Sequence, residues 1–240
     1  MKKTLLSLLA ILLCFSFTAC NKSAENGSAQ NGATPNEAEQ VTSYVELTAE
    51  NTIVIEGQSY ALPMPAATLL NNGWNDTYDA MKEEIESEKA KKYPAFGLDN
   101  GGKEKIKGVG YYNPDSEKTT LDKCAVVSLD LVGTIEEQSY EKCSFTLPGG
   151  ITENSTYTDV LAVYGSKTEP KDYRVTDDYE AKKQNSENFS KHGFSVIYTP
   201  TDNNAAPYKY IFFFNADESI KYVSVESVNY QSDALAAFKK

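Results

Sequence analysis

The chain has 240 residues, of which 40% are apolar, 24% are charged and 11% are aromatic. This composition suffices for one large folded domain or two small ones, and it excludes disorder throughout and a multi-pass membrane protein. Asp and Glu outnumber Lys and Arg by 34 to 23, which gives a net charge of −11. Because such an acidic chain repels phosphate backbones, we expect no nucleic-acid partner.

The first twenty residues have the composition of a signal peptide. Lys2 and Lys3 precede an apolar run over residues 5–17 that is too short to span a membrane. The run ends in Phe17-Thr18-Ala19-Cys20, which resembles the lipobox of bacterial lipoproteins. The resemblance implies that residues 1–19 are removed, that Cys20 carries acyl chains such as palmitate, and that lipid anchors the protein to the extracytoplasmic face of the cell membrane. An ordinary secretory leader with an incidental Cys is the alternative.

A polar stretch follows the lipobox. Residues 21–43 contain little besides small and polar side chains, too few apolar groups to offset the entropy of ordering them. We therefore predict a lipidated Cys and a flexible tether over residues 20–43. Without Lys2 and Lys3 the remaining chain has 34 acidic and 21 basic residues, a net charge of −13.

The folded body is expected over residues 44–230, and its local signals are mostly those of antiparallel strands. A glycine turn at Glu56-Gly57-Gln58 indicates a hairpin, and Gly165 stands where a helix C-cap glycine belongs. The region 76–92 fits either a helix or a charged loop. Strands are predicted over 52–55, 59–62, 109–112, 124–132, 173–179, 194–198, 208–214 and 220–228, and helices over 66–70 and from Asn154 or Ser155 to about Tyr164. The fold class is therefore α+β, with an antiparallel sheet.

An internal repeat divides this body. Both halves have a strand, a Leu-Pro pair, a short helix and a glycine, so we predict two related modules, each a short helical segment packed on an antiparallel sheet. The first module covers residues 44–140 and the second 141–230, followed by a C-terminal tail over 231–240. Two registers of the repeat remain open, because Tyr112-Asn113-Pro114 matches Tyr198-Thr199-Pro200 while Tyr111-Tyr112-Asn113 also matches Phe213-Phe214-Asn215.

Several motifs carry a family resemblance. Leu147-Pro148-Gly149-Gly150-Ile151-Thr152 is followed by Ser155-Thr156-Tyr157-Thr158-Asp159-Val160 and then by Val163-Tyr164-Gly165. These segments, with 56–63 and 72–74 of the first half, resemble lipoproteins of clostridial gut bacteria. The modules are also similar to those of beta-lactamase inhibitor protein and of small outer-membrane assembly lipoproteins. The resemblance implies a fold and a location, and it brings no catalytic residue with it.

No catalytic or metal site is predicted. His192 is the one histidine, and a catalytic base needs an orienting partner and a nucleophile that the sequence does not place beside it. A carboxylate pair for glycoside hydrolysis could be chosen from 34 acidic residues in many ways, so none is singled out. The acidic segments Asp159, Asp177-Asp178 and Asp202-Asn203-Asn204 lack the ligand spacing of a calcium loop. We expect no cofactor.

Cys124 and Cys143 are the other two cysteines of the mature chain. Outside the membrane, two cysteines on neighbouring strands can form a disulfide. Two buried, unpaired thiols are the alternative. The sequence leaves both open.

The strand over 208–214 provides the candidate binding surface. Alternation places Tyr208, Tyr210, Phe212 and Phe214 on one face, and Ile211 with Phe213 on the other. One hypothesis is that Tyr208, Tyr210 and Phe212 form an exposed surface for a protein or glycan partner. A central strand buried on both faces is the alternative.

The expected function is therefore binding by a monomeric, lipid-anchored surface protein, with enzymatic activity left uncertain. The first alternative is a surface hydrolase that uses carboxylates. The second is a structural lipoprotein of envelope assembly.

Overall fold

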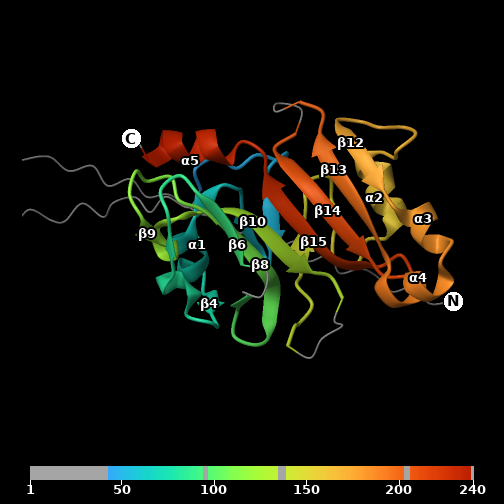
Figure 1. Cartoon of the computed structure of the whole chain (residues 1–240), viewed down its shortest axis with the longest axis horizontal. Helices are drawn as coiled ribbons and strands as arrows, with labels where there is room; N and C mark the ends of the chain where they lie inside the picture. Colours follow the sequence, from blue (N-terminus) through green and yellow to red (C-terminus); the bar gives the residue numbers. More distant parts are fainter. Residues whose placement is uncertain (1–42, 94–96, 135–138, 203–205, 239–240) are drawn as a thin grey trace, which may run out of the picture. The chain divides into compact units, whose positions relative to one another are not determined.

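A ten-stranded sheet organises the chain, as Figure 1 shows. The computed structural model describes residues 43–93, 97–134, 139–202 and 206–238, so the predicted signal peptide, Cys20 and almost all of the tether lie outside the described residues. The strand order is β12-β13-β14-β15-β10-β8-β7-β4, with β3 beside β10 and β6 beside β8. These strands are β3 (Met64–Pro65), β4 (Asn75–Asp76), β6 (Ala90–Tyr93), β7 (Leu98–Asp99), β8 (Glu104–Tyr112), β10 (Ala125–Val132), β12 (Tyr173–Asp177), β13 (Phe194–Pro200), β14 (Tyr208–Phe214) and β15 (Ile220–Ser227).

Two small sheets and several short helices complete the described elements. The small sheets contain β1 (Ile53–Ile55), β2 (Gln58–Tyr60) and β11 (Phe145–Thr146), and β5 (Glu84–Ile85) with β9 (Thr119–Thr120). The helices are α1 (Ala66–Asn71), α2 (Tyr157–Tyr164), α3 (Tyr179–Lys183), α4 (Ser186–His192) and α5 (Tyr230–Phe238), with 3-10 turns η1 (Ala80–Lys82) and η2 (Leu121–Lys123). Each pairing between labelled strands is antiparallel, which confirms the α+β class with an antiparallel sheet.

Local sequence explains the best-predicted elements. In the hairpin of β1 and β2, Glu56 and Gly57 have positive φ angles of 50° and 79°, as a tight turn requires. Helix α2 begins with a capping box, in which the Thr156 side chain accepts from the Asp159 N–H and the Asp159 carboxylate accepts from the Thr156 N–H. The helix ends at Gly165, whose φ of 93° suits a residue without a side chain.

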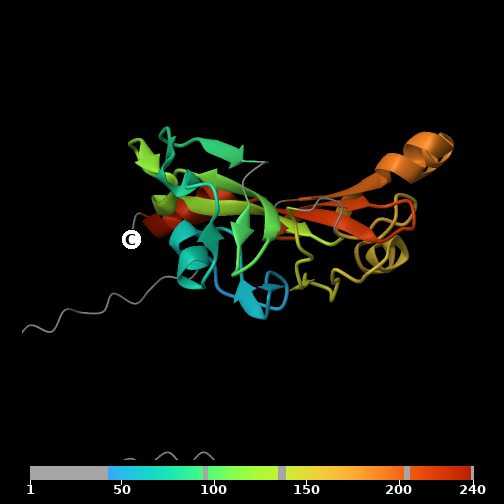
Figure 2. The ribbon, with the colours of Figure 1, turned by 90° about the horizontal axis from the view of Figure 1, so that it is seen from below.

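One face of the large sheet is covered. Figure 2 shows β1, β2, α1 and α2 on the same side of it. One continuous hydrophobic core lies between these layers, and it contains Trp74, Leu129, Val160, Tyr210 and Val225, all at most 1% exposed. The strands of the second half therefore share their core with elements of the first.

The region 76–92 is neither one helix nor a plain loop: it contains the end of β4, the 3-10 turn η1, β5 and most of β6. Asp79 and Glu88 have φ angles of 56° and 54°, which interrupt any helix, and the Asp76 carboxylate accepts the N–H groups of Tyr78 and Met81. Such local bonds to the backbone compete with helical ones. The apolar spacing that suggested a helix instead places Met81 in the core while Tyr78 is 57% exposed.

Three helices were not predicted. Helices α3 and α4 follow β12, and the part predicted as a C-terminal tail forms α5. Ala234 of α5 is buried against Tyr112, Ala125 and Val127, which explains why this segment is ordered. Within the described residues, none of the helices is long and apolar enough to cross a membrane.

Both predicted modules contribute strands to the one large sheet. β10 of the first half pairs with β15 of the second, from Ser128 opposite Glu226 to Val132 opposite Tyr222. β11 of the second half also pairs with β1 of the first. The described residues belong to one compact unit.

Candidate functional site

The residues predicted as a binding surface lie in the core. Tyr208, Tyr210 and Phe212 are each 0% exposed, because their side of β14 faces α2 and the β1–β2 layer. This corrects the predicted docking surface, since a buried side chain cannot contact a partner. The alternation itself is confirmed, with every second residue of β14 buried from Tyr208 to Phe214.

Specific contacts hold these side chains in place. The Tyr164 ring of α2 stacks on Tyr210 with ring centroids 4.9 Å apart. The Tyr208 hydroxyl donates to the Asn51 carbonyl at 2.6 Å and accepts from the Leu62 N–H at 3.0 Å. Burial raises the pKa of Tyr208 and of Tyr210, as expected for phenols removed from water. Tyr208 therefore joins the second half of the chain to the first.

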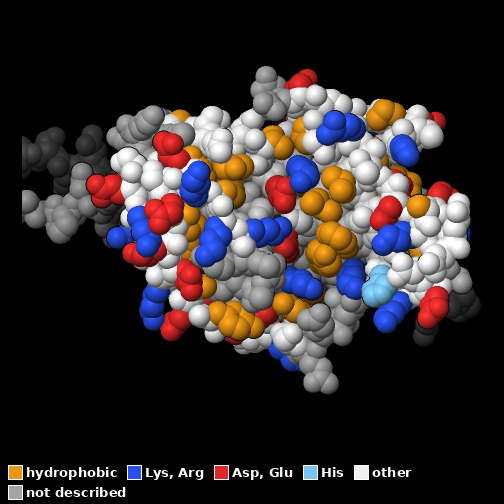
Figure 3. Space-filling view, viewed as in Figure 1, with side chains coloured by type: hydrophobic (Ala, Val, Ile, Leu, Met, Phe, Trp, Pro, Cys, Tyr) orange, Lys and Arg blue, Asp and Glu red, His pale blue; other side chains and the backbone are white. Residues whose placement is uncertain are grey.

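The opposite side of the sheet carries apolar groups that are only partly buried. We call it the open face, and define it by Ile197, Lys209, Ile211, Phe213 and Tyr222, none of which is fully buried. Ile197 lies opposite Ile211, and Phe213 lies opposite Tyr222 with the two rings stacked 4.1 Å apart. Figure 3 looks onto this face and shows a patch of hydrophobic side chains with Lys and Arg side chains around it.

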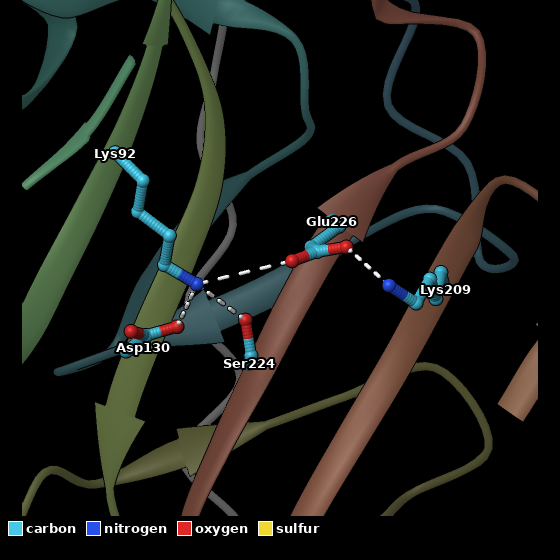
Figure 4. A network of polar contacts seen from close by, with 5 residues as sticks. All are labelled: Lys92, Asp130, Lys209, Ser224 and Glu226. Carbon is cyan, nitrogen blue, oxygen red and sulfur yellow. Dashed lines mark hydrogen bonds and ion pairs between the residues drawn. The ribbon is translucent and has the colours of Figure 1, made fainter. Parts of the chain in front are cut away.

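A polar network lies beside the apolar patch. The Lys92 ammonium on β6 donates to Asp130 Oδ1 at 2.9 Å and to Ser224 Oγ at 3.0 Å, and it lies 3.8 Å from Glu226 Oε1. Glu226 Oε2 in turn accepts from Lys209 Nζ at 2.9 Å. Figure 4 shows how this chain of contacts connects β6, β10, β15 and β14. Because Asp130 is only 10% exposed, its ion pair is the best shielded of the network.

Gly110 has no side chain beside Lys92, so the Lys92 side chain can extend across the sheet. Gly110 on β8 lies opposite Lys92 on one side and Ser128 on the other. A Cβ atom at position 110 would collide with the Ser128 hydroxyl, so the position has no space for a side chain. Gly110 and Ser128 line a groove of about 280 Å³, which Lys92, Glu226 and Tyr230 also line.

The charge of the open face differs from that of the chain. Among the described residues, four basic and two acidic side chains lie around the apolar patch: Lys92, Lys107, Arg174 and Lys209, with Asp130 and Glu226. The chain as a whole has a net charge of −11. An acidic protein therefore presents one locally cationic, partly apolar surface.

The network has the geometry of strand cross-linking rather than of a reaction centre. Lys92 lies between Asp130 and Glu226, so each carboxylate already has a cationic partner. A carboxylate pair that cleaves glycosides must instead face the bond to be broken. His192 is the last residue of α4 and is exposed. Over the described ranges, no three His, Cys, Asp or Glu side chains gather closely enough to hold a metal ion.

Cys124 and Cys143 are free and fully buried, so they match the alternative of two unpaired thiols and not the disulfide. Cys124 directly precedes β10, while the Cys143 N–H donates to the Val132 carbonyl at the other end of that strand. Eight strand residues span roughly 26 Å, whereas a disulfide needs Cα atoms within about 7 Å. Burial raises the pKa of Cys124, with help from Asp122, to about 12.

Comparisons with known proteins give no match. No family model, no curated protein and no solved structure matches this chain.

The sequence contained part of the signal for the open face. The alternation of β14 separates Ile211 and Phe213 from the tyrosines, and both faces are apolar. Nothing within the strand indicates which face α2 covers, so the pattern alone favours the more aromatic face as the binding surface. Lys92, Asp130 and Glu226 were missed because a network between strands far apart in sequence leaves no spacing motif.

Proposed function

We propose that this protein is a lipid-anchored extracytoplasmic binding protein that docks a macromolecular partner on its open face. The observation that carries the proposal is the partly exposed apolar patch of Ile197, Ile211, Phe213 and Tyr222. Sheets that are covered on one side normally present polar residues on the other, and exposed apolar patches commonly mark interaction sites. Binding, rather than catalysis, is what such a surface supports best.

The anchor rests on the sequence. Cys20 follows Ala19 at the end of the apolar leader, and the polar stretch after it suits a spacer between lipid and folded body. In cells supplied with radiolabelled palmitate, the wild-type chain should incorporate label and the Cys20→Ala variant should not. Label retained by Cys20→Ala would refute lipidation at this residue.

We also propose that the two halves are related modules that fold together. Leu62-Pro63 precedes α1, Leu147-Pro148 precedes α2, and both helices lie on the covered face. The likeness of these two arrangements supports a repeat. The shared sheet means that neither module has a complete core of its own.

A capture experiment tests the docking role. The purified full chain is incubated with solubilised native envelope, beside Ile211→Ser on the open face and Leu70→Ser on α1. Leu70 is a matched control, because it is an exposed apolar side chain, 38% accessible, that lies off the open face. We expect Ile211→Ser alone to lose the captured partner. Capture that survives Ile211→Ser, or no specific capture at all, would count against the proposal.

A further inference from the structure

We propose that the partner docked on the open face is a protein surface with an apolar centre and an acidic rim. This inference rests on the proposed function and specifies its partner. It follows from three properties of the face: its charge, the geometry of its aromatic rings and its flatness.

Charge complementarity gives the acidic rim. Asp130 and Glu226 already contact Lys92, and Glu226 also contacts Lys209. The cations exceed the carboxylates, and Arg174 is exposed on β12, the edge strand next to Ile197 on β13. An acidic partner would meet attraction here, while the remaining surface of this net-negative chain would repel it. The electrostatic field of the protein therefore directs an acidic partner to the open face.

The aromatic geometry favours a protein over a glycan. Sugars bind aromatic residues by stacking on a free ring face. Phe213 on β14 stacks on the Tyr222 ring at 4.1 Å, and Lys107 on β8 lies over the same ring, 5.3 Å from its centroid, from the other side of β15. Ile197 and Ile211 offer aliphatic surface, which packs well against apolar protein side chains.

Flatness argues against a membrane surface. Ile197, Ile211, Phe213 and Tyr222 belong to paired strands and are each partly buried, so they do not project as an inserting loop would. A protein partner with a matching flat surface needs no such projecting loop.

Two synthetic peptides provide the direct test. Both have an Ile-Phe-Val-Phe centre, with Asp and Glu flanks in one peptide and Lys flanks in the other, and their affinity for the full chain is measured by fluorescence anisotropy. We expect the acidic peptide to bind about tenfold more tightly than the basic one, a difference of about 1.4 kcal/mol. Arg174→Glu should abolish that preference. Lys167→Glu makes the same charge change at an exposed position off the open face and should leave the preference intact.

Polygalacturonate and vesicles of phosphatidylglycerol serve as the other anionic probes. Tighter binding of either one, or equal binding of both peptides, would overturn the acidic-protein inference, and so would no binding of either peptide. In each of these cases, envelope capture that remains sensitive to Ile211→Ser would leave the proposed function standing. Loss of that sensitivity as well would refute both.

Discussion

Lys92 stabilises the sheet by joining strands through one ammonium group. It belongs to β6 and contacts Asp130 on β10 and Ser224 on β15, partners 38 and 132 positions away in sequence. Asp130 depends on it most, because only 10% of that side chain is exposed. Removing one partner of a shielded ion pair leaves the other charge uncompensated.

Replacing Lys92 by Met should therefore destabilise the protein. The variant keeps the length of the side chain and removes the charge next to Asp130, and we expect the free energy of unfolding to fall by about 2 kcal/mol. Urea unfolding followed by circular dichroism measures the change. Lys82→Met is the control, because its pair with Asp79 is 79% and 81% exposed and should contribute less than about 0.5 kcal/mol. If the two variants lost the same free energy of unfolding, the Lys92–Asp130 pair would contribute no more than the exposed Lys82–Asp79 pair.

The two buried thiols give a second prediction at this scale. Cys124 and Cys143 should resist alkylation in the native protein and react fully in urea without any reductant, because they are buried and unbridged. Mass spectrometry of a chain with Cys14→Ala and Cys20→Ala, in which Cys124 and Cys143 are the remaining cysteines, counts the added groups. We expect two added alkyl groups in urea without reductant. If no group were added until a reductant was present, the two cysteines would form a disulfide.

The sequence predicted the state of the two cysteines better than the role of Lys92. Burial of Cys124 and Cys143 was one of two alternatives, and only the length of β10 between them decides against the bridge. Lys92 received no role, since its partners are brought to it by the register of β6, β8, β10 and β15. Contacts of that kind depend on strand pairing, which local patterns do not specify.

At the scale of elements, strands were predicted better than helices. β14 has the predicted bounds, because strict alternation of apolar residues is a strong local signal. α3 and α4 were missed, since they are short and polar and are held by a few aromatic contacts such as Phe189 on Phe194, with ring centroids 5.8 Å apart. The covered face of β14 depends on α2, an element more than forty positions earlier in the chain.

Gly193 tests the junction between α4 and β13. It ends α4 with a φ of 65°, and a Cβ atom there would collide with the Phe214 carbonyl. Gly193→Ala should cost about 3 kcal/mol or more, from backbone strain and overpacking together. Gly150 is the matched control: it has a φ of 82° and open space around its Cβ position, so Gly150→Ala should cost only about 1 kcal/mol of strain. Thermal unfolding compares the two, and a similar loss in both would contradict the collision.

At the scale of the whole molecule, the tyrosine-rich core determines how stability responds to alkali. Burial, with a contribution from Asp172, raises the pKa of Tyr173 to about 12 from an ordinary value of 10.0. The Cys124 thiol rises from 9.0 to about 12. Both groups are neutral in the folded protein at a pH where the unfolded chain has begun to lose those protons. Their contribution to stability is complete below pH 9 and is lost as the pH rises towards 12.

Urea unfolding should therefore show constant stability from pH 7 to about 9 and a steady fall above it. Tyr173→Phe removes one of the titrating groups and should make the fall between pH 10 and about 12 less steep. A stability that stays flat to pH 11 would mean that the phenols and thiols ionise equally well in the folded and unfolded states.

The net charge of the chain conceals the feature on which the proposed function depends. A net charge of −11 excludes a generally basic surface. Strand pairing in the large sheet nevertheless places four basic side chains on one face: Lys92, Lys107, Arg174 and Lys209. That face is also where Ile197, Ile211 and Phe213 remain partly exposed. Charge and apolar surface therefore coincide only in the folded molecule.

Site-specific photo-crosslinking in intact cells tests the docking role most directly. A photoreactive phenylalanine is placed at position 213 on the open face, or at position 78, where the native tyrosine is 57% exposed but lies off that face. We predict a discrete adduct from position 213 and none from position 78. No adduct at 213, or the same adducts at both positions, would contradict the open face as a docking surface.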